Sequence, residues 1–263
     1  MYYHPENMRH IAKFGNLILN KKIKLVQLAD IIINQLNIRR NDVVLVNVSY
    51  HNFNLIDSTP RDLIHLLKMI TGTQGTLIVP SLSKDHKIQS SGGFKKNGNE
   101  IENDDIFFET FKQMADTTHI NLPRESFAVW GKMAKKIAED QQESDTTSGS
   151  NDMFFRLSQF KAKIIGIGVP LAQLYTGSAS DYSNKAGDND KEINGSINSV
   201  GGKSDNSYQD TIYNILRSKS RHELSELFPE SDLKAFSRGG IHFFRADAER
   251  IYSKAILLSK STN

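Results

Sequence analysis

The feature that most constrains the fold is a strand–helix–strand pattern over residues 43–83. Two short runs rich in β-branched residues, Val43–Val48 and Thr76–Val79, lie on either side of a stretch whose apolar residues recur with helical spacing. The connections are short, so the three pieces form a βαβ unit. Its two strands are then parallel neighbours in one sheet.

The ends of the central helix are marked by residues with known preferences. Thr59 suits the N-cap, Pro60 the first helical position, and Asp62 the acidic position of a capping box. Gly72 follows the last apolar residue and is placed to end the helix. These local signals fix the helix between the two strands and set the direction of both.

Polar residues follow both strands of this unit. In open α/β sheets, ligands bind beyond the carboxyl ends of the strands. The residues there are Asn47, Ser49, Tyr50 and His51 after the first strand, and Pro80, Ser81, Ser83, Lys84, Asp85 and His86 after the second. We therefore expect the functional site at this edge. His51 and His86 are candidate proton acceptors, because imidazole exchanges protons near neutral pH.

The composition excludes several classes of protein. The chain has 263 residues, 38% of them hydrophobic and 24% charged, which is typical of a globular protein. A net charge of +3 without dense basic runs argues against nucleic acid as a partner, and the lack of cysteine excludes disulfides and thiol chemistry. We find neither a signal peptide nor a membrane-spanning stretch, so we expect a cytoplasmic protein that does not bind membranes.

Further elements alternate along the chain and predict a single α/β domain over residues 1–263. We expect a central mixed, largely parallel sheet flanked by helices. Helices are predicted at 8–20, 24–36, 104–115, 131–139 and 153–157, strands at 126–130 and 163–169, and a strand or turn followed by a helix over 239–258. A polar loop covers 84–98, and residues 183–206 are almost without apolar side chains, which predicts a flexible insertion.

Common motifs of catalysis and cofactor binding do not match. The glycines at 72 and 75 lack the following lysine of a phosphate-binding loop, and those at 166 and 168 lack dinucleotide-binding spacing. No two of the eight histidines have the spacing of a metal site, so no metal is expected. Ser126 stands outside a hydrolase nucleophile motif. From these residues alone, the chain is an α/β domain with a polar edge.

The order of several short segments resembles the aminoglycoside 3-N-acetyltransferase family. The family pattern G-D-x-V-x-V-H-x-S, then G-T-L-x-x-P, then H-P-x-x-S-x-x-x-x-G-x-x-A and a G-V strand end runs through most of the chain. The matching residues are Asn41, Asp42, Val44, Val46, Asn47, Ser49, Gly75, Thr76, Leu77, Pro80, Leu122, Pro123, Ser126, Gly131, Ala134, Gly168 and Val169, with a glycine-led strand and helix near 239–256.

Three family histidines are replaced in this chain. Asn47 and Leu122 stand where the pattern has histidine, and Ser178 and Asp181 stand at its H-x-x-E pair, the expected base and its orienting acid. Serine is not basic near pH 7, so Ser178 cannot act as the general base. Asp181 remains as a group to contact or activate an acceptor.

The resemblance implies an N-acetyltransferase that uses acetyl-CoA on an aminoglycoside or another amino sugar, with antibiotic resistance as its biological setting. It implies CoA contacts from Asn47, Ser49, Tyr50, Ser126 and Phe127, and it leaves a homodimer open. The altered pattern leaves three routes for the chemistry. His51 or His86 supplies the base, the acceptor differs, or the protein is a catalytically inactive family member that binds a ligand or partner. A sugar-modifying enzyme of surface polysaccharide synthesis is a further alternative.

Overall fold

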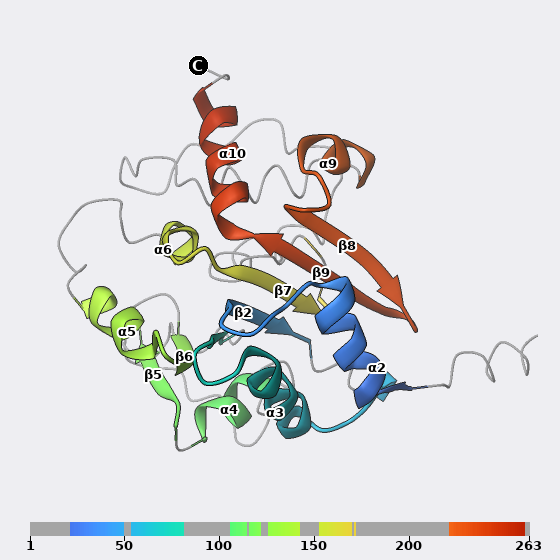
Figure 1. Cartoon of the computed structure of the whole chain (residues 1–263), viewed down its shortest axis with the longest axis vertical. Helices are drawn as coiled ribbons and strands as arrows, with labels where there is room; N and C mark the ends of the chain where they lie inside the picture. The colour runs from blue at the N-terminus through green and yellow to red at the C-terminus, as the bar shows by residue number, and fades with distance from the viewer. Residues whose placement is uncertain are drawn as a thin grey trace, which may run out of the picture.

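The computed structural model places a seven-stranded sheet between two layers of helices (Figure 1). The structure describes residues 22–49, 54–81, 106–114, 116–121, 126–142, 153–169, 171 and 221–260. The predicted helix at 8–20, the loop at 84–98 and the insertion at 183–206 lie outside these residues. The prediction of one domain over residues 1–263 stays a prediction.

The sheet has the strand order β5-β6-β4-β2-β7-β9-β8. Its strands are β2 (Val43–Val48), β4 (Thr76–Pro80), β5 (Thr118–Asn121), β6 (Ser126–Gly131), β7 (Lys163–Ile167), β8 (Leu233–Arg238) and β9 (Ile241–Asp247). The predicted parallel pairing of β2 with β4 is confirmed, and β7 lies parallel to β2 on the other side.

The predicted mixed sheet is confirmed, with β5 and β8 running in the direction of the three parallel strands and β6 and β9 in the opposite direction. Parallel pairing is confined to the three central strands, and the four outer pairings are antiparallel. The cause is a strand pair at each edge of the sheet. β8 and β9 are joined through Gly239 and Gly240, whose φ angles of 58° and 79° suit a tight turn, and such turns join antiparallel strands.

Helices cover both faces of the sheet. One layer contains α2 (Leu25–Asp30), its π-helical continuation η1 (Ile31–Gln35), α3 (Pro60–Thr71) and α4 (Ile106–Lys112). The other contains α5 (Ala134–Gln142), α6 (Met153–Gln159), α9 (Arg221–Leu227) and α10 (Ala248–Lys260). A small parallel pair, β1 (Ile23–Lys24) with β3 (Ile56–Asp57), stands apart from the main sheet. Among the described helices, none is long and apolar enough to cross a membrane.

Helix α3 begins and ends as its sequence predicts. The Thr59 hydroxyl accepts a hydrogen bond from the Asp62 N–H at 3.2 Å, and the Thr59 N–H donates to the Asp62 carboxylate at 2.9 Å. These bonds satisfy backbone donors that have no partner inside the helix. The bond from the Thr59 N–H to the carboxylate lowers the pKa of Asp62 most, and a bond from the Thr59 hydroxyl to the same carboxylate oxygen lowers it further. Gly72 ends the helix with a φ of 68°.

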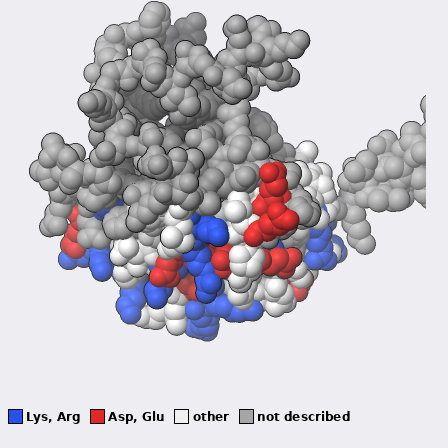
Figure 2. Space-filling model, turned by 90° about the horizontal axis from the view of Figure 1, so that it is seen from above, with Lys and Arg blue, Asp and Glu red and all other residues white. Residues whose placement is uncertain are grey.

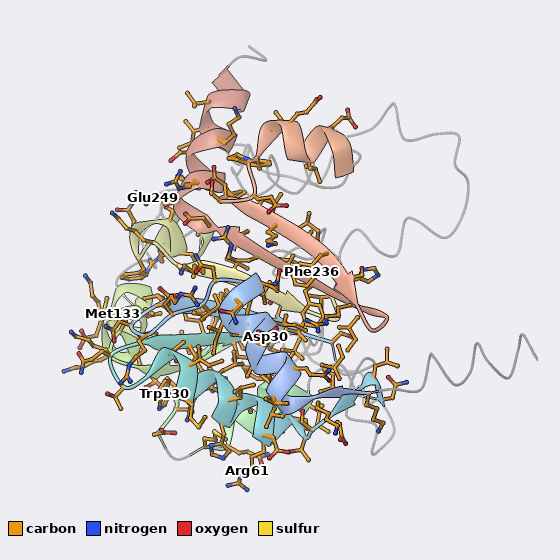
Figure 3. All side chains as sticks on the ribbon, turned by 45° about the vertical axis from the view of Figure 1, so that its right-hand side comes forward. Asp30, Arg61, Trp130, Met133, Phe236 and Glu249 are labelled. Atoms are coloured by element: carbon orange, nitrogen blue, oxygen red, sulfur yellow. The ribbon has the colours of Figure 1, made fainter. Side chains whose placement is uncertain are left out.

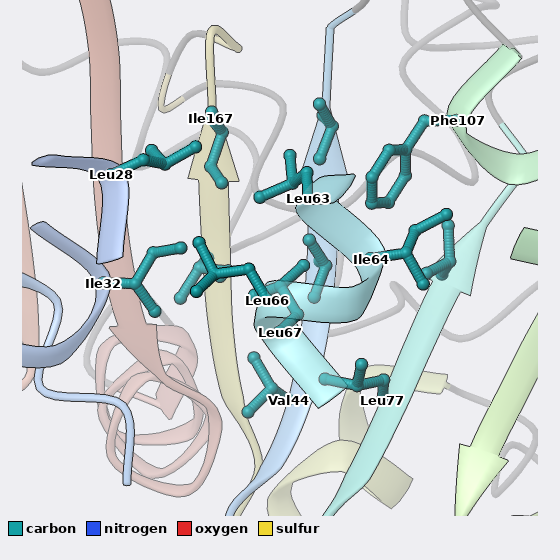
Figure 4. Close-up of a cluster of buried hydrophobic side chains, with 14 of the residues drawn as sticks. Leu28, Ile32, Val44, Leu63, Ile64, Leu66, Leu67, Leu77, Phe107 and Ile167 are labelled. Carbon is teal, nitrogen blue, oxygen red and sulfur yellow. The ribbon is translucent and has the colours of Figure 1, made fainter. Parts of the chain in front are cut away.

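The α3 layer is held by one continuous cluster of buried side chains (Figure 4). Leu63, Ile64 and Leu67 are almost fully buried and lie over the parallel centre of the sheet. Their sheet partners include Val44, Val46, Val48, Leu77, Val79 and Ile167. Strands of this kind are buried on both faces, which explains why β2 and β4 read as continuous apolar runs instead of alternating ones.

A cluster of Lys68, Asp116 and Trp130 joins α3 to β6. Lys68 makes an ion pair of 2.7 Å with Asp116, and its ammonium lies 4.8 Å from the ring centre of Trp130. The Trp130 indole N–H donates to the same carboxylate at 2.6 Å (Trp130 is labelled in Figure 3). Burial raises the pKa of Asp116, but its hydrogen bond to Lys68 and the charge of Lys68 together lower it.

Candidate functional site

The carboxyl ends of the three parallel strands meet the first residues of two antiparallel strands at one edge of the sheet. The Ser49 N–H donates to the Ile167 carbonyl at 3.0 Å, which continues the β2–β7 ladder. The Ser81 N–H donates to the Ser126 carbonyl at 2.8 Å, and the Gly168 N–H donates to the His242 carbonyl at 2.7 Å. We call Ser49, Ser81, Ser126, Gly168 and His242 the carboxyl edge.

Four of the predicted CoA-contacting residues lie in or beside this edge, but on two faces of the sheet. Asn47, 1% exposed, and the buried Phe127 point to the face covered by α5 and α6. Ser49 is half-buried and shares the face of Asn47, since it lies two residues further along β2. Ser126 is buried and points to the opposite face. A ligand on one face therefore cannot contact both Ser49 and Ser126 through their side chains.

The other predicted site residues lie outside the described part of the chain. They are Tyr50, His51, His86, Ser178 and Asp181. Their assignments as cofactor contact, base or acceptor contact stay predictions.

The buried floor below Ser49 is built from Asn47, Gly166 and Phe244. Gly166 pairs with Asn47 on one side and with Phe244 on the other. The Phe244 ring occupies the space that a side chain at position 166 would need, because a Cβ placed there would lie 2.0 Å from a ring carbon. Glycine at 166 therefore lets this ring fill the sheet surface beside Asn47.

The next row toward the strand ends is formed by Ser49 after β2, Gly168 after β7 and His242 of β9, which lie side by side. His242 lies two residues before Phe244 on β9, so its side chain points to the same face as Asn47 and Ser49. The imidazole is exposed. Its Nδ1 lies 2.7 Å from the hydroxyl oxygen of Ser237, the paired residue on β8. Gly168 contributes no side chain between Ser49 and His242.

Our sequence reasoning missed His242. Its signal was a histidine in the strand that follows Gly239 and Gly240. An antiparallel strand begins at the edge where its parallel neighbour ends, so such a histidine reaches the carboxyl edge. Finding it requires the antiparallel pairing of β9 with β7, which the sequence pattern did not predict.

The turn that carries His242 is anchored on its other face. The rings of Phe236 and Phe243 stack at 5.5 Å and 19° on the side away from His242 (Phe236 is labelled in Figure 3). Arg238 lies 3.7 Å from Asp30 of α2. The turn glycine Gly239 packs against Ile23 of β1. These contacts pack the β8–β9 turn against β1 and α2.

Charged side chains of both signs lie on one face of the described surface. Figure 2 shows Lys and Arg side chains interspersed with Asp and Glu on the face it presents. Arg245 is buried near the opposite end of β9, where its Nη2 donates to the carbonyls of Glu230 and Ser231 at 2.8 and 2.5 Å. Burial lowers the pKa of its guanidinium. Its contacts tie down the chain before β8, away from the carboxyl edge.

The groups at the carboxyl edge have a limited chemistry. Serine hydroxyls donate and accept hydrogen bonds, and an imidazole that donates from one ring nitrogen can accept a proton at the other. This set suits a neutral ligand with amide or hydroxyl groups and a reaction in which a nucleophile loses a proton.

Comparison with protein families gives one match. The model of a family described as "Aminoglycoside 3-N-acetyltransferase" matches residues 45–177. This range includes Asn47, Ser49, Ser126 and Gly168 of the edge and its floor, and ends before His242. A search of curated proteins gives no match.

Solved structures with a similar fold are aminoglycoside acetyltransferases of low sequence identity. AAC-VIa bound to sisomicin is 15% identical, with a TM-score of 0.58 over 92% of this chain and 99% of that one. AAC-IIIb in a binary complex with CoASH is 13% identical, with a TM-score of 0.56 over 90% and 96%. The apoenzyme of AAC(3)-IVa is 15% identical, with a TM-score of 0.59 over 92% and 90%. At these identities, the likeness establishes the shared fold.

Proposed function

Because this chain belongs to the aminoglycoside 3-N-acetyltransferase family, we propose that it is a CoA-dependent N-acetyltransferase acting on an aminoglycoside or another amino sugar. The observation that carries the proposal is the family match over residues 45–177, which covers the parallel core of the sheet and most of its carboxyl edge. Two solved structures of similar fold hold sisomicin and CoASH, which supports these ligand classes for the present chain.

The described residues fit part of a CoA molecule. The half-buried Ser49 stands at the end of β2, where its hydroxyl group can bond an amide of a pantetheine arm. Phe127 is 2% exposed and packs behind this edge, so we assign it to the apolar support of the site and not to direct contact. When bound, acetyl-CoA supplies the acetyl group as a thioester.

Isothermal titration calorimetry with acetyl-CoA tests the cofactor. We expect saturable binding, weakened about threefold to tenfold by Ser49→Ala, which corresponds to the loss of one hydrogen bond. Ser231→Ala is the matched control, because Ser231 is also a serine beside a strand but stands at the opposite edge of the sheet. Absence of binding at millimolar acetyl-CoA would refute the proposed function.

A second function is favoured by one specific observation. Asn47 stands where the family pattern has a histidine, and it is buried at the floor of the edge. An amide side chain does not exchange protons near pH 7, so this change removes an acid–base group. The second candidate is therefore a catalytically inactive family member that binds a ligand.

The two functions are separated by acetyl transfer. Release of the CoA thiol is measured with sisomicin, apramycin and glucosamine as acceptors. Transfer to any of them, proportional to enzyme concentration, would exclude the inactive candidate. CoA binding without transfer would favour it over the proposed enzyme.

A further inference from the structure

We propose that His242 is the general base of this chain, with Ser237 as its positioning residue. The inference rests on the proposed function, since it assigns a residue to acetyl transfer. It follows from the row formed by Ser49, Gly168 and His242, which places an exposed imidazole at the carboxyl edge of the parallel strands.

The first argument is geometric. Strands in a sheet lie about 4.8 Å apart, so Ser49 and His242 are separated by roughly 10 Å across β7. Gly168 is the residue between them and has no side chain of its own. A ligand lying over Gly168 can therefore contact the Ser49 hydroxyl at one end and the imidazole at the other.

The second argument is the hydrogen bond to Ser237. A base needs one ring nitrogen free to accept a proton, and the other is commonly held by a neighbour that fixes the tautomer and the ring plane. Here Nδ1 is the held nitrogen, at 2.7 Å from Ser237 Oγ. With the proton on Nδ1 donated to this oxygen, Nε2 carries the lone pair and points away from β8.

The third argument is rigidity. Base catalysis depends on a fixed distance between the base and the reacting nitrogen. The stacked Phe236 and Phe243 rings support the β8–β9 turn from the other face, and Arg238 with Asp30 ties it to α2. His242 is therefore exposed to a ligand while its backbone is held.

The proposed step conserves atoms and charge. Nε2 of His242 removes a proton from the acceptor amine as the amine nitrogen bonds to the carbonyl carbon of the acetyl thioester. The carbon–sulfur bond then breaks, and the imidazolium gives the proton to the leaving sulfur. The products are an N-acetylated amine and the free thiol of CoA, and the neutral imidazole is regenerated.

The assignment is specific to this chain's own residues. Ser178 occupies the family's basic position and cannot serve there, whereas His242 lies beyond the residues that the family model matches. The proposal therefore relocates the base from position 178 to β9, the strand that pairs with β7 on the side away from β2.

The test combines calorimetry, nuclear magnetic resonance and kinetics on the full chain. The imidazole signals of isotope-labelled histidine are assigned with His242→Gln and recorded with and without saturating acetyl-CoA. We expect the His242 signal to shift and the signal of His65, exposed on α3 in the other helix layer, to stay in place. An unmoved His242 signal in the CoA-bound protein would overturn the proposal and leave the proposed function intact.

Kinetics give the second arm. His242→Gln should lower kcat at least about 100-fold, the usual range for loss of a general base, while the Kd for acetyl-CoA stays within about threefold. Ser237→Ala should lower kcat less than His242→Gln does. Ser237→Thr should keep kcat near the wild-type value, because threonine keeps the hydroxyl. His65→Gln is the matched control and should change neither. Full transfer by His242→Gln would refute the assignment, and failure of the wild-type chain to bind acetyl-CoA would refute the proposed function together with it.

Discussion

Replacing Gly166 by alanine would place a methyl group where the ring of Phe244 now lies. The new Cβ would stand 2.0 Å from one ring carbon and 2.5 Å from two others. Non-bonded carbons normally stay about 3.5 Å or more apart, so the ring must move by roughly 1.5 Å. Phe244 is 1% exposed and belongs to a cluster of buried side chains, and protein interiors hold few voids that a displaced ring could enter.

The expected loss follows from this overlap. Overpacking a well-filled core costs about 1–3 kcal/mol, and the clash here is at the severe end. Alanine also restricts the unfolded chain, which offsets about 0.4–1 kcal/mol. We therefore expect Gly166→Ala to lower the free energy of unfolding by about 2 kcal/mol. The assay is urea unfolding followed by the fluorescence of Trp130, the one tryptophan of the chain.

A double-mutant cycle tests the cause. Phe244→Leu replaces the clashing ring with a smaller side chain. The double variant should therefore be destabilised by about 1–2 kcal/mol less than the sum of the two single variants. Phe243→Leu is the matched control, because Phe243 is the adjacent residue of β9 and points to the other face. Equal coupling of Gly166→Ala to both changes, or a loss below about 0.5 kcal/mol, would refute the reasoning.

Two further predictions concern the α3 layer, and urea unfolding measures both. Thr59→Ala removes the hydroxyl that accepts from the Asp62 N–H and should cost about 1 kcal/mol, whereas an unchanged urea midpoint would show that the cap is unimportant. Asp116→Asn should destabilise the protein at pH 7, because it removes the charge paired with Lys68. The folded pKa of Asp116 is lowered, so this contribution is present above the unfolded pKa of about 3.9 and disappears as the pH falls through the folded value. A difference between variant and wild type that is as large at pH 2 as at pH 7 would contradict the ion-pair explanation.

The central βαβ unit could be predicted because its signals are local. Thr59, Asp62 and Gly72 mark the helix ends within one or two turns, and the short connections force the flanking strands to be parallel. The same logic identified the polar strand ends. Asn47 and Ser49 lie at the carboxyl edge as expected from the direction of β2 alone.

The outer strands of the sheet could not be placed from the sequence, because the contacts that position them are not local. β8 (Leu233–Arg238) mixes apolar and basic residues and has only its first residue buried, so its sequence shows no clear burial pattern. Its place depends on pairing with β9, and that of β9 depends on pairing with β7. The direction of these strands relative to β7 is set by tertiary contacts that no short window of sequence contains.

Asn47, which stands where the family pattern has a histidine, occupies a buried position that suits an acid–base group poorly. Position 47 is in the buried row with Gly166 and Phe244, where an ionisable side chain would lose hydration and charge poorly. His242 lies in the next row outward, and its side chain is exposed. A base at His242 needs no additional strand or loop, because β9 begins where the parallel strands end. Under the proposed function, the base thus lies on a strand of the sheet, two strand spacings or about 10 Å from Ser49.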